Sequence, residues 1–131
     1  MRTISAAIIG IITCFVLIYI IEMIGMNLFP VKVKINPKNY NELKALIDSI
    51  PLPALITLIV GHGISLFAGI FVAKKIQNKS AIPFLLVFLV MLMATISNLA
   101  MIPHPLWFKI ADISSVCLAG LISWRVFNWK F

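Results

Sequence analysis

Four long apolar runs constrain this chain more than any other feature of its sequence. They cover residues 4–28, 53–73, 81–102 and 106–127, and each is long enough to cross a bilayer, which needs about 20 residues. In lipid such runs must be helical, because no water is present to satisfy a backbone N–H or C=O group. Only 11% of the residues are charged, whereas a water-soluble domain carries about 25%. We therefore predict an all-α membrane protein in which residues 1–131 form one transmembrane domain, an antiparallel four-helix bundle.

The connections between these runs are short, with one exception. Residues 74–80 and residues 103–105 are too few for anything but a direct reversal, so they predict antiparallel neighbours. The first connection, residues 29–52, is longer. Within it, residues 31–35 alternate apolar and basic side chains, which is typical of a short extended segment.

A short amphipathic helix is predicted over residues 40–50, inside this longer connection. Asn39 or Asn41 can cap its first turn, Glu42 lies in that turn, and Pro51 ends it. One face of the helix carries its apolar residues, which are Tyr40, Leu43, Leu46, Ile47 and Ile50. We expect this helix to lie on the membrane surface or to cap the bundle on its outer side.

The distribution of Lys and Arg predicts the orientation. Six lie on the side of the two termini: Arg2, Lys74, Lys75, Lys79, Arg125 and Lys130. Five lie on the other side: Lys32, Lys34, Lys38, Lys44 and Lys109. The first group lies closer to the helix ends, which favours cytoplasmic termini. Because these short basic clusters separate apolar runs, we expect them to contact anionic lipid headgroups and not nucleic acid.

Two rows of small residues indicate close helix packing. One row, in the second apolar run, recurs every four residues and consists of Gly61, Ser65, Gly69 and Ala73. The other, in the fourth run, consists of Ser115, Ala119 and Ser123. Small side chains let membrane helices approach closely and gain dispersion contacts. Either the rows pack within one bundle, or they form the interface of a homo-oligomer or of a complex with a partner protein.

Each of the four runs places one polar residue in the outer half of the membrane. These residues are Glu22, His62, Asn98 and Asp112. A charge at bilayer depth costs at least about 2.5 kcal/mol, so such side chains should face one another and not lipid. We expect His62 to face Glu22 or Asp112, with Asn98 nearby. His104 and Lys109 are expected at the outer rim, where they would suit a lipid headgroup.

This polar cluster has several interpretations. It can be a hydrogen-bonded clasp that fixes helix register, a site for a proton or a solute, or a lipid-headgroup site. One His and two carboxylates can also hold a metal, but their spacing matches no recognised ligand motif, so we expect no metal and no cofactor. Cys14 and Cys117 stand alone, which argues against thiol–disulfide chemistry.

Two stretches carry a resemblance to a known group of proteins. "IEMIGMNLFP", at the end of the first run, and "NLAMIPHPLWFKIAD", at the third connection, resemble small four-helix bacterial membrane proteins. The resemblance implies the four-helix architecture and a location in the bacterial inner membrane, but no activity. The small multidrug-resistance transporters are similar only in size and in a glutamate on the first helix. In this chain Glu22 lies in the outer third of that helix, and the long first connection does not fit them.

Two hypotheses for function follow from the sequence. The first is a non-enzymatic helix-packing module, acting as a homo-oligomer or as an accessory subunit of a larger membrane complex. The second is a small proton-coupled carrier or membrane enzyme that uses the Glu22, His62 and Asp112 cluster. The two hypotheses differ in one observable feature. The second requires that the cluster line a hydrated cavity, whereas in the first these side chains can form a closed contact.

The orientation is tested by cysteine labelling in intact cells. We expect a membrane-impermeant thiol reagent to label Asn39→Cys and to leave Gln77→Cys unlabelled, because the basic residues favour an outer first connection. Permeabilised cells supply the control, since both positions should then react. Labelling of Gln77→Cys with protection of Asn39→Cys would reverse the orientation.

Overall fold

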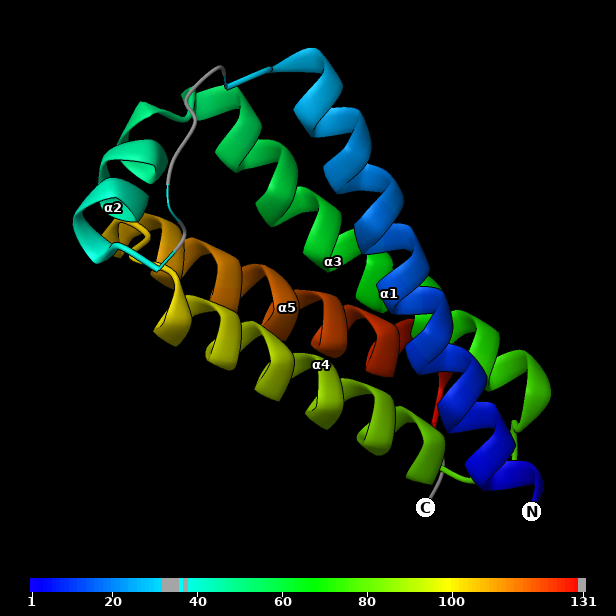
Figure 1. Cartoon of the computed structure of the whole chain (residues 1–131). Helices are drawn as coiled ribbons and strands as arrows, with labels where there is room; N and C mark the ends of the chain where they lie inside the picture. The colour runs from blue at the N-terminus through cyan, green and yellow to red at the C-terminus, as the bar shows by residue number, and fades with distance from the viewer. Residues whose placement is uncertain (32–35, 37, 130–131) are drawn as a thin grey trace.

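The computed structural model describes residues 1–31, 36 and 38–129 (Figure 1). In this part of the chain all regular secondary structure is helical. The five helices are α1 Arg2–Leu28, α2 Tyr40–Ser49, α3 Leu52–Ile76, α4 Ile82–Met101 and α5 Leu106–Phe127. All but α2 are long and apolar enough to cross a membrane, which confirms the prediction of an all-helical protein with four apolar spans. The segment predicted to be extended, residues 31–35, lies outside the described residues except for Val31.

The helix bounds follow the apolar runs, with one clear extension. Helix α3 continues to Ile76, three residues beyond the predicted end, and its last turn contains Lys74 and Lys75. Lysine has a high helix propensity, and its positive charge interacts favourably with the C-terminal end of a helix. The end of an apolar run is therefore not the end of this helix.

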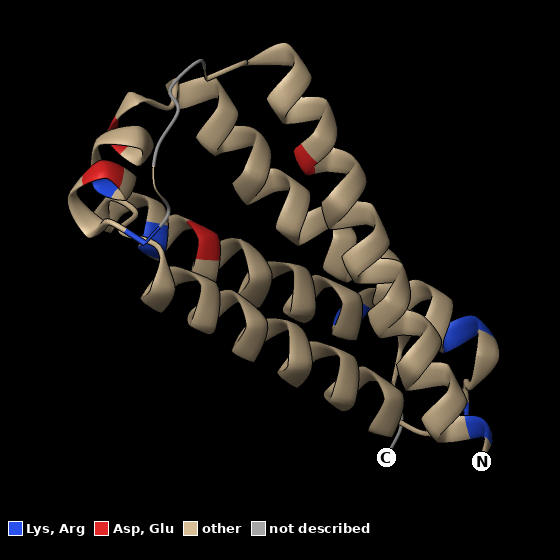
Figure 2. Ribbon diagram, viewed as in Figure 1, with Lys and Arg blue, Asp and Glu red and all other residues tan. Residues whose placement is uncertain are grey.

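Both termini and the α3–α4 connection lie at one end of the molecule (Figure 1). The Arg2 Nε donates a hydrogen bond to the Ile76 carbonyl oxygen at 2.9 Å, which joins the start of α1 to the end of α3. The Lys74 ammonium lies 4.4 Å from the centre of the Trp129 ring, a cation–π contact that brings in the C-terminal segment. Figure 2 shows basic residues gathered at this end, with a second group near α2.

Helices α1 and α3 approach each other most closely at two glycines. A Cβ atom on Gly69 would lie 2.5 Å from the Gly10 carbonyl oxygen and would also overlap the Cys14 Sγ. A Cβ atom on Gly10 would lie 2.8 Å from the Gly69 carbonyl oxygen. Lipid tails are as apolar as these helices, so close van der Waals contact is the main source of their association.

The small row of α3 therefore packs within the chain. Besides Gly69, a Cβ on Gly61 would meet the Ile21 side chain of α1 at 2.7 Å, and the Ala73 Cβ lies 3.1 Å from the position of a Cβ on Gly10. Ser65 is fully buried as well. Because α1 covers this row, the row is not free to form an interface with another molecule.

The small row of α5 behaves differently. Ser115 Oγ donates a hydrogen bond to the Ile59 carbonyl oxygen of α3 at 2.8 Å. Ser123 Oγ bonds instead within its own helix, to the Ala119 carbonyl oxygen at 2.7 Å. Ala119 and Ser123 are buried. Only the first of these residues thus makes a polar link between α5 and α3.

The core is concentrated at the end that carries the termini. Its largest buried cluster includes Leu66, Ile70, Val87 and Val116, from α3, α4 and α5. A smaller cluster of Leu55, Leu99 and Phe108 lies toward α2. Between the two, the α1–α3 pair and the α4–α5 pair diverge, and α2 lies across the open end (Figure 1).

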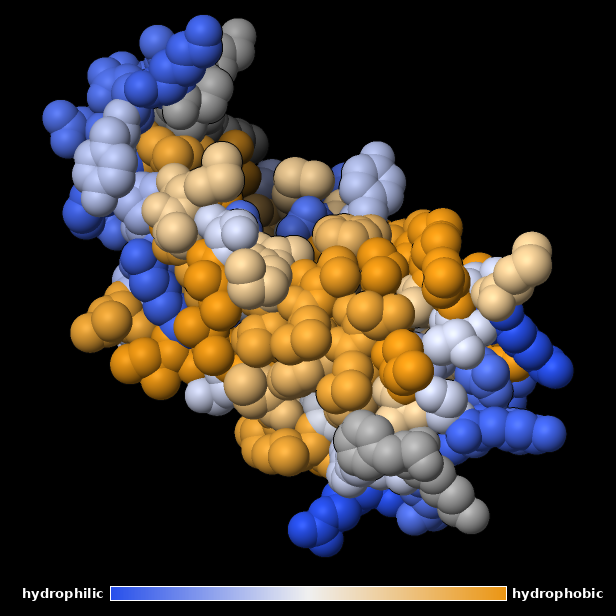
Figure 3. Space-filling view, turned by 90° about the horizontal axis from the view of Figure 1, so that it is seen from below, coloured by the Kyte–Doolittle hydropathy of each residue, from blue (hydrophilic) through white to orange (hydrophobic). Residues whose placement is uncertain are grey.

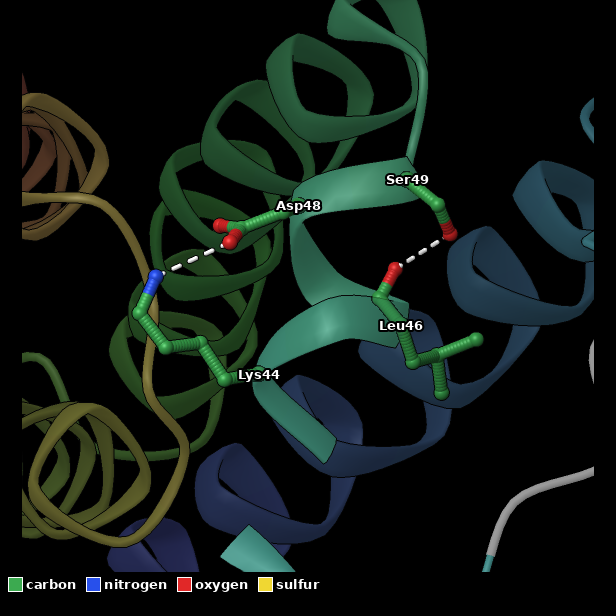
Figure 4. A network of polar contacts seen from close by, with 4 residues as sticks. All are labelled: Lys44, Leu46, Asp48 and Ser49. Carbon is green, nitrogen blue, oxygen red and sulfur yellow. Dashed lines mark hydrogen bonds and ion pairs between the residues drawn. The ribbon is translucent and has the colours of Figure 1, made fainter. Parts of the chain in front are cut away.

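Helix α2 is held by local hydrogen bonds. Asn39 Oδ1 accepts from the backbone N–H of Asn41 at 3.1 Å and of Glu42 at 3.4 Å, as a helix cap does. Figure 4 shows the exposed Lys44–Asp48 ion pair at 2.9 Å and the hydrogen bond from Ser49 Oγ to the Leu46 carbonyl oxygen. The Asp48 carboxylate raises the pKa of Lys44, first through this hydrogen bond and then through its charge.

The apolar face predicted for α2 differs in one residue. Ile47 is buried and Leu43, Leu46 and Ile50 are half-buried, but Tyr40 is 64% exposed. Tyr40 is the first residue of the helix, where the chain arrives from the cap and the helix has not yet reached the bundle.

The surface matches what a bilayer requires. Figure 3 shows a wide hydrophobic band in the middle of one face, with hydrophilic residues at both ends. The apolar residues of this band are exposed because no other part of the described chain covers them. In a membrane they would contact lipid tails at no cost.

A matched pair of glycine substitutions tests the α1–α3 contact. Gly69→Ala should destabilise the protein by about 1–3 kcal/mol, because the new methyl group overlaps backbone atoms of Gly10. Gly25→Ala is the control, since a Cβ there has no neighbour within 4 Å. The measurement is reversible unfolding in mixed micelles, and equal stability of the two variants would contradict the packing.

Candidate functional site

A buried polar contact joins His62 of α3 to Asp112 of α5. The His62 Nδ1 lies 2.7 Å from the Asp112 Oδ1. Asp112 is fully buried and His62 is only 9% exposed. Of the two carboxylates that the sequence offered to His62, the structure therefore brings Asp112 to the ring.

The glycines beside His62 have a structural explanation. Ile21 of α1 approaches Gly61, and the Ser115 hydroxyl of α5 lies 2.6 Å from the position of a Cβ on Gly63. Side chains at these two positions would push the neighbouring helices away. The glycines thus let α1 and α5 come close on either side of the imidazole, which keeps Asp112 within hydrogen-bonding distance.

The hydrogen bond to Asp112 determines which ring nitrogen of His62 remains available. With Asp112 ionised, the carboxylate accepts a hydrogen from Nδ1, and a neutral ring then has its lone pair on Nε2. No hydrogen bond within the described residues involves Nε2. The second carboxylate oxygen, Asp112 Oδ2, is buried and has no partner in this part of the chain.

His62 also forms part of the wall of a cavity of about 340 Å³. The cavity lies between α1, α3 and α4, and its lining residues are Phe15, Ile18, Tyr19, Glu22, His62, Met91, Ala94, Thr95 and Asn98. Glu22 and Asn98, two further residues of the predicted polar layer, thus share one space with His62. Asp112 is not part of the lining and contacts the cavity wall only through the His62 ring.

Glu22 is the one carboxylate of the cavity wall. No hydrogen bond or ion pair joins it to another described residue, and it is partly exposed. None of the lining residues is Lys or Arg. An unpaired carboxylate in a space without a cation attracts positive charge or hydrogen-bond donors.

The two residues expected at the outer rim lie at the α4–α5 connection and the start of α5. The His104 ring stacks on Phe108 at 4.4 Å between centres, and its Nδ1 is buried without a partner among the described residues. Burial lowers the pKa of His104, with a smaller opposing effect from the Asp112 carboxylate. Neither His104 nor Lys109 lines the cavity.

Several residues of the wall were not singled out by the sequence. Thr95 is buried, and Phe15, Ile18, Tyr19, Met91 and Ala94 complete the lining. Their spacing does contain a signal, because positions 15, 18, 19 and 22 share one face of α1, and 91, 95 and 98 share one face of α4. In a helix that is apolar all round, however, this spacing does not show which face turns inward. Only the polar residues indicate that face.

No metal site emerges among the residues that the structure describes, since no three His, Cys, Asp or Glu side chains converge. Comparisons with protein-family models, with curated proteins and with solved structures found no match. The function is therefore argued from the cavity and its chemistry.

The structure assigns different roles to the two acids, and stability measurements can separate them. Asp112→Leu should cost about 1–3 kcal/mol of unfolding free energy, because it leaves the buried His62 Nδ1 without a partner. Glu22→Gln should change it by less than about 0.5 kcal/mol, since that carboxylate has no partner to lose. Both are measured by unfolding in detergent, and an equal loss in the two variants would contradict the assignment.

Proposed function

We propose that this protein is a small carrier in which a solute and a proton share one intramembrane site. The observation that supports this best is the cavity, because it places the Glu22 carboxylate, the Asn98 amide and the His62 ring around a common space. A clasp that only fixed helix register would have no need of such a space. Of the two hypotheses from the sequence, the carrier is thus the better supported.

The proton chemistry of the site follows from the histidine. Nε2 accepts a proton from water or from a solute in the cavity, and the Nδ1–H bond to Asp112 then stabilises the resulting imidazolium. The proton leaves from the same nitrogen, either to water or to the Glu22 carboxylate. No electrons move and no covalent bond to the solute forms, so the step requires no cofactor.

The charge of the site indicates the solute. Glu22 has no counter-ion in the cavity, and Asp112 adds a second negative charge behind His62. When His62 is neutral the site carries net negative charge, and when His62 is protonated it carries one positive charge more. We infer that a solute with a positive charge binds to the first state and is released from the second, which couples its movement to a proton.

The membrane arrangement that we propose has an antiparallel four-helix bundle in the bacterial inner membrane. Both termini are cytoplasmic, and α2 lies on the outer side. The basic residues Arg2, Lys74, Lys75 and Arg125 support this orientation, since they flank helix ends on the side of the termini. The resemblance of "IEMIGMNLFP" and "NLAMIPHPLWFKIAD" to small bacterial membrane proteins supports the location.

A second candidate is the helix-packing module, either a homo-oligomer or an accessory subunit of a larger complex. A shallow groove of about 550 Å³ between α3 and α5 favours it, because Gly63, Ser115 and Ala119 are among its lining residues. Small residues on a lipid-facing groove allow a helix from another molecule to approach. Association would use this groove and not the row that α1 already covers.

Access of water to the cavity separates the two candidates. In a background with Cys14→Ala and Cys117→Ala, we expect Asn98→Cys in liposomes to react with a small positively charged thiosulfonate at least ten times faster than Met93→Cys. Asn98 lines the cavity, whereas Met93 lies on the same helix and is 62% exposed to the lipid side.

Equal, slow labelling at both positions would mean that no water reaches Asn98. The carrier would then be wrong, and the packing module would be the better explanation. Far-UV circular dichroism of both variants controls for unfolding, because a collapsed bundle would expose every cysteine.

A further inference from the structure

A second cavity, of about 230 Å³, lies between the end of α1 and the start of α3. Its wall is formed by α1, by the start of α3, by the residue that follows α2, and by Phe29 and Val31 after α1. The lining residues are Glu22, Gly25, Met26, Phe29, Val31, Ile50, Ala54, Thr57 and Leu58. We call it the outer chamber.

The outer chamber continues the first cavity along the same helix faces. On α1 the two linings together include positions 15, 18, 22 and 25, which recur every three or four residues on one face, and Phe29 follows the end of the helix. On α3 they include positions 54, 58 and 62, also on one face. Glu22 belongs to both linings. The combined groove extends along α1 from Phe15 to Met26, roughly 17 Å, since a helix rises about 1.5 Å per residue.

The two halves of this groove differ in chemistry. The first cavity has the polar groups of Glu22, His62, Thr95 and Asn98 in its wall. Apart from Glu22, the outer chamber has only Thr57 as a polar side chain, and that hydroxyl already donates to the Pro53 carbonyl oxygen at 2.8 Å. Among the described residues, no Lys or Arg lines either half. The groove therefore offers one free carboxylate, with a polar space on one side and an apolar space on the other.

We propose that the site takes a lipophilic cation, an amine or quaternary ammonium whose charged group lies at Glu22 and whose apolar chain occupies the outer chamber. This proposal rests on the carrier function and specifies its solute. An anionic lipid would meet the unpaired Glu22 carboxylate, and a small hydrophilic cation would leave the outer chamber unused. The first cavity also contains the rings of Phe15 and Tyr19, and aromatic side chains are what proteins use to bind quaternary ammonium groups.

Gly25 allows the outer chamber to be filled without disturbing the fold. It lines the chamber, and a Cβ at this position would meet no atom within 4 Å. Gly25→Leu therefore places a side chain in the space that the apolar chain of the ligand would occupy. Ile24→Phe, one residue away on the lipid-facing side of α1, adds bulk to the same helix outside the groove and is the matched control.

The test compares two cations that differ only in their chain, tetramethylammonium and hexyltrimethylammonium. Both are added to Asn98→Cys protein in lipid nanodiscs, and the rate of thiosulfonate labelling reports occupancy. We expect hexyltrimethylammonium to halve this rate at a concentration at least ten times lower than tetramethylammonium requires. Gly25→Leu should remove this difference, Ile24→Phe should keep it, and Glu22→Gln should abolish protection by both cations.

The outcomes distinguish this proposal from the carrier function on which it rests. Equal protection by the two cations, lost in Glu22→Gln, would leave a cation carrier in place and overturn the lipophilic ligand. A chain effect that persists in Gly25→Leu would do the same, because the chain would then bind elsewhere. If Asn98→Cys is labelled from water and neither cation protects it, the cationic ligand is wrong whatever the fate of the cavity.

Discussion

The hydrogen bond between His62 Nδ1 and Asp112 Oδ1 connects α3 to α5 in the interior of the bundle, where both side chains are buried. An isolated charge there would be costly, so each group depends on the other for a partner. Interhelical hydrogen bonds in membranes contribute modestly to stability, about 0.6–2 kcal/mol. Their greater effect here is directional, because the bond occupies the Nδ1 side of the ring and no hydrogen bond of the described residues involves Nε2. The carboxylate of Glu22 then faces a space that already contains a proton acceptor.

The helix bundle is closely packed at one end and more open at the other, and this difference makes that space possible. At the end with the termini, Gly10 and Gly69 bring the backbones of α1 and α3 into contact, and the larger apolar cluster fills the region between α3, α4 and α5. Toward α2 the helix pairs diverge (Figure 1), and a cavity lies between α1, α3 and α4. A bundle packed equally along its length would press Glu22 and Asn98 against a neighbouring helix. The divergence instead leaves both at the wall of a cavity.

The sequence predicts the helices of this protein well and their rotation poorly. Four apolar runs can only be helices in lipid, so their number and approximate bounds follow from hydropathy alone. The polar residues at similar depth in each run indicated that Glu22, His62, Asn98 and Asp112 would gather. Which of the two acids would reach His62 depends on how each helix is rotated about its axis, and a helix that is apolar all round gives no such information.

Other features escaped prediction for related reasons. Ala6, Gly10 and Cys14 form a further row of small residues spaced by four, but the spacing does not say that Gly10 of this row is the partner of Gly69. Thr95 and Tyr19 have ordinary spacing and become part of the site only because α1 and α4 turn these faces inward. Tyr40 was assigned to the apolar face of α2 by periodicity, yet it lies where the helix begins and stays exposed. Each of these depends on tertiary contacts that local pattern does not contain.

The central claim is that His62 is held by Asp112 on one side and open to water on the other. Nitrogen-15 NMR of the imidazole, in protein reconstituted into bilayers and held near neutral pH, measures both properties at once. The structure predicts a ring protonated at Nδ1 and hydrogen-bonded to a carboxylate, with magnetisation transfer from water protons to Nε2. A ring protonated at Nε2, without transfer from water to either nitrogen, would contradict the account.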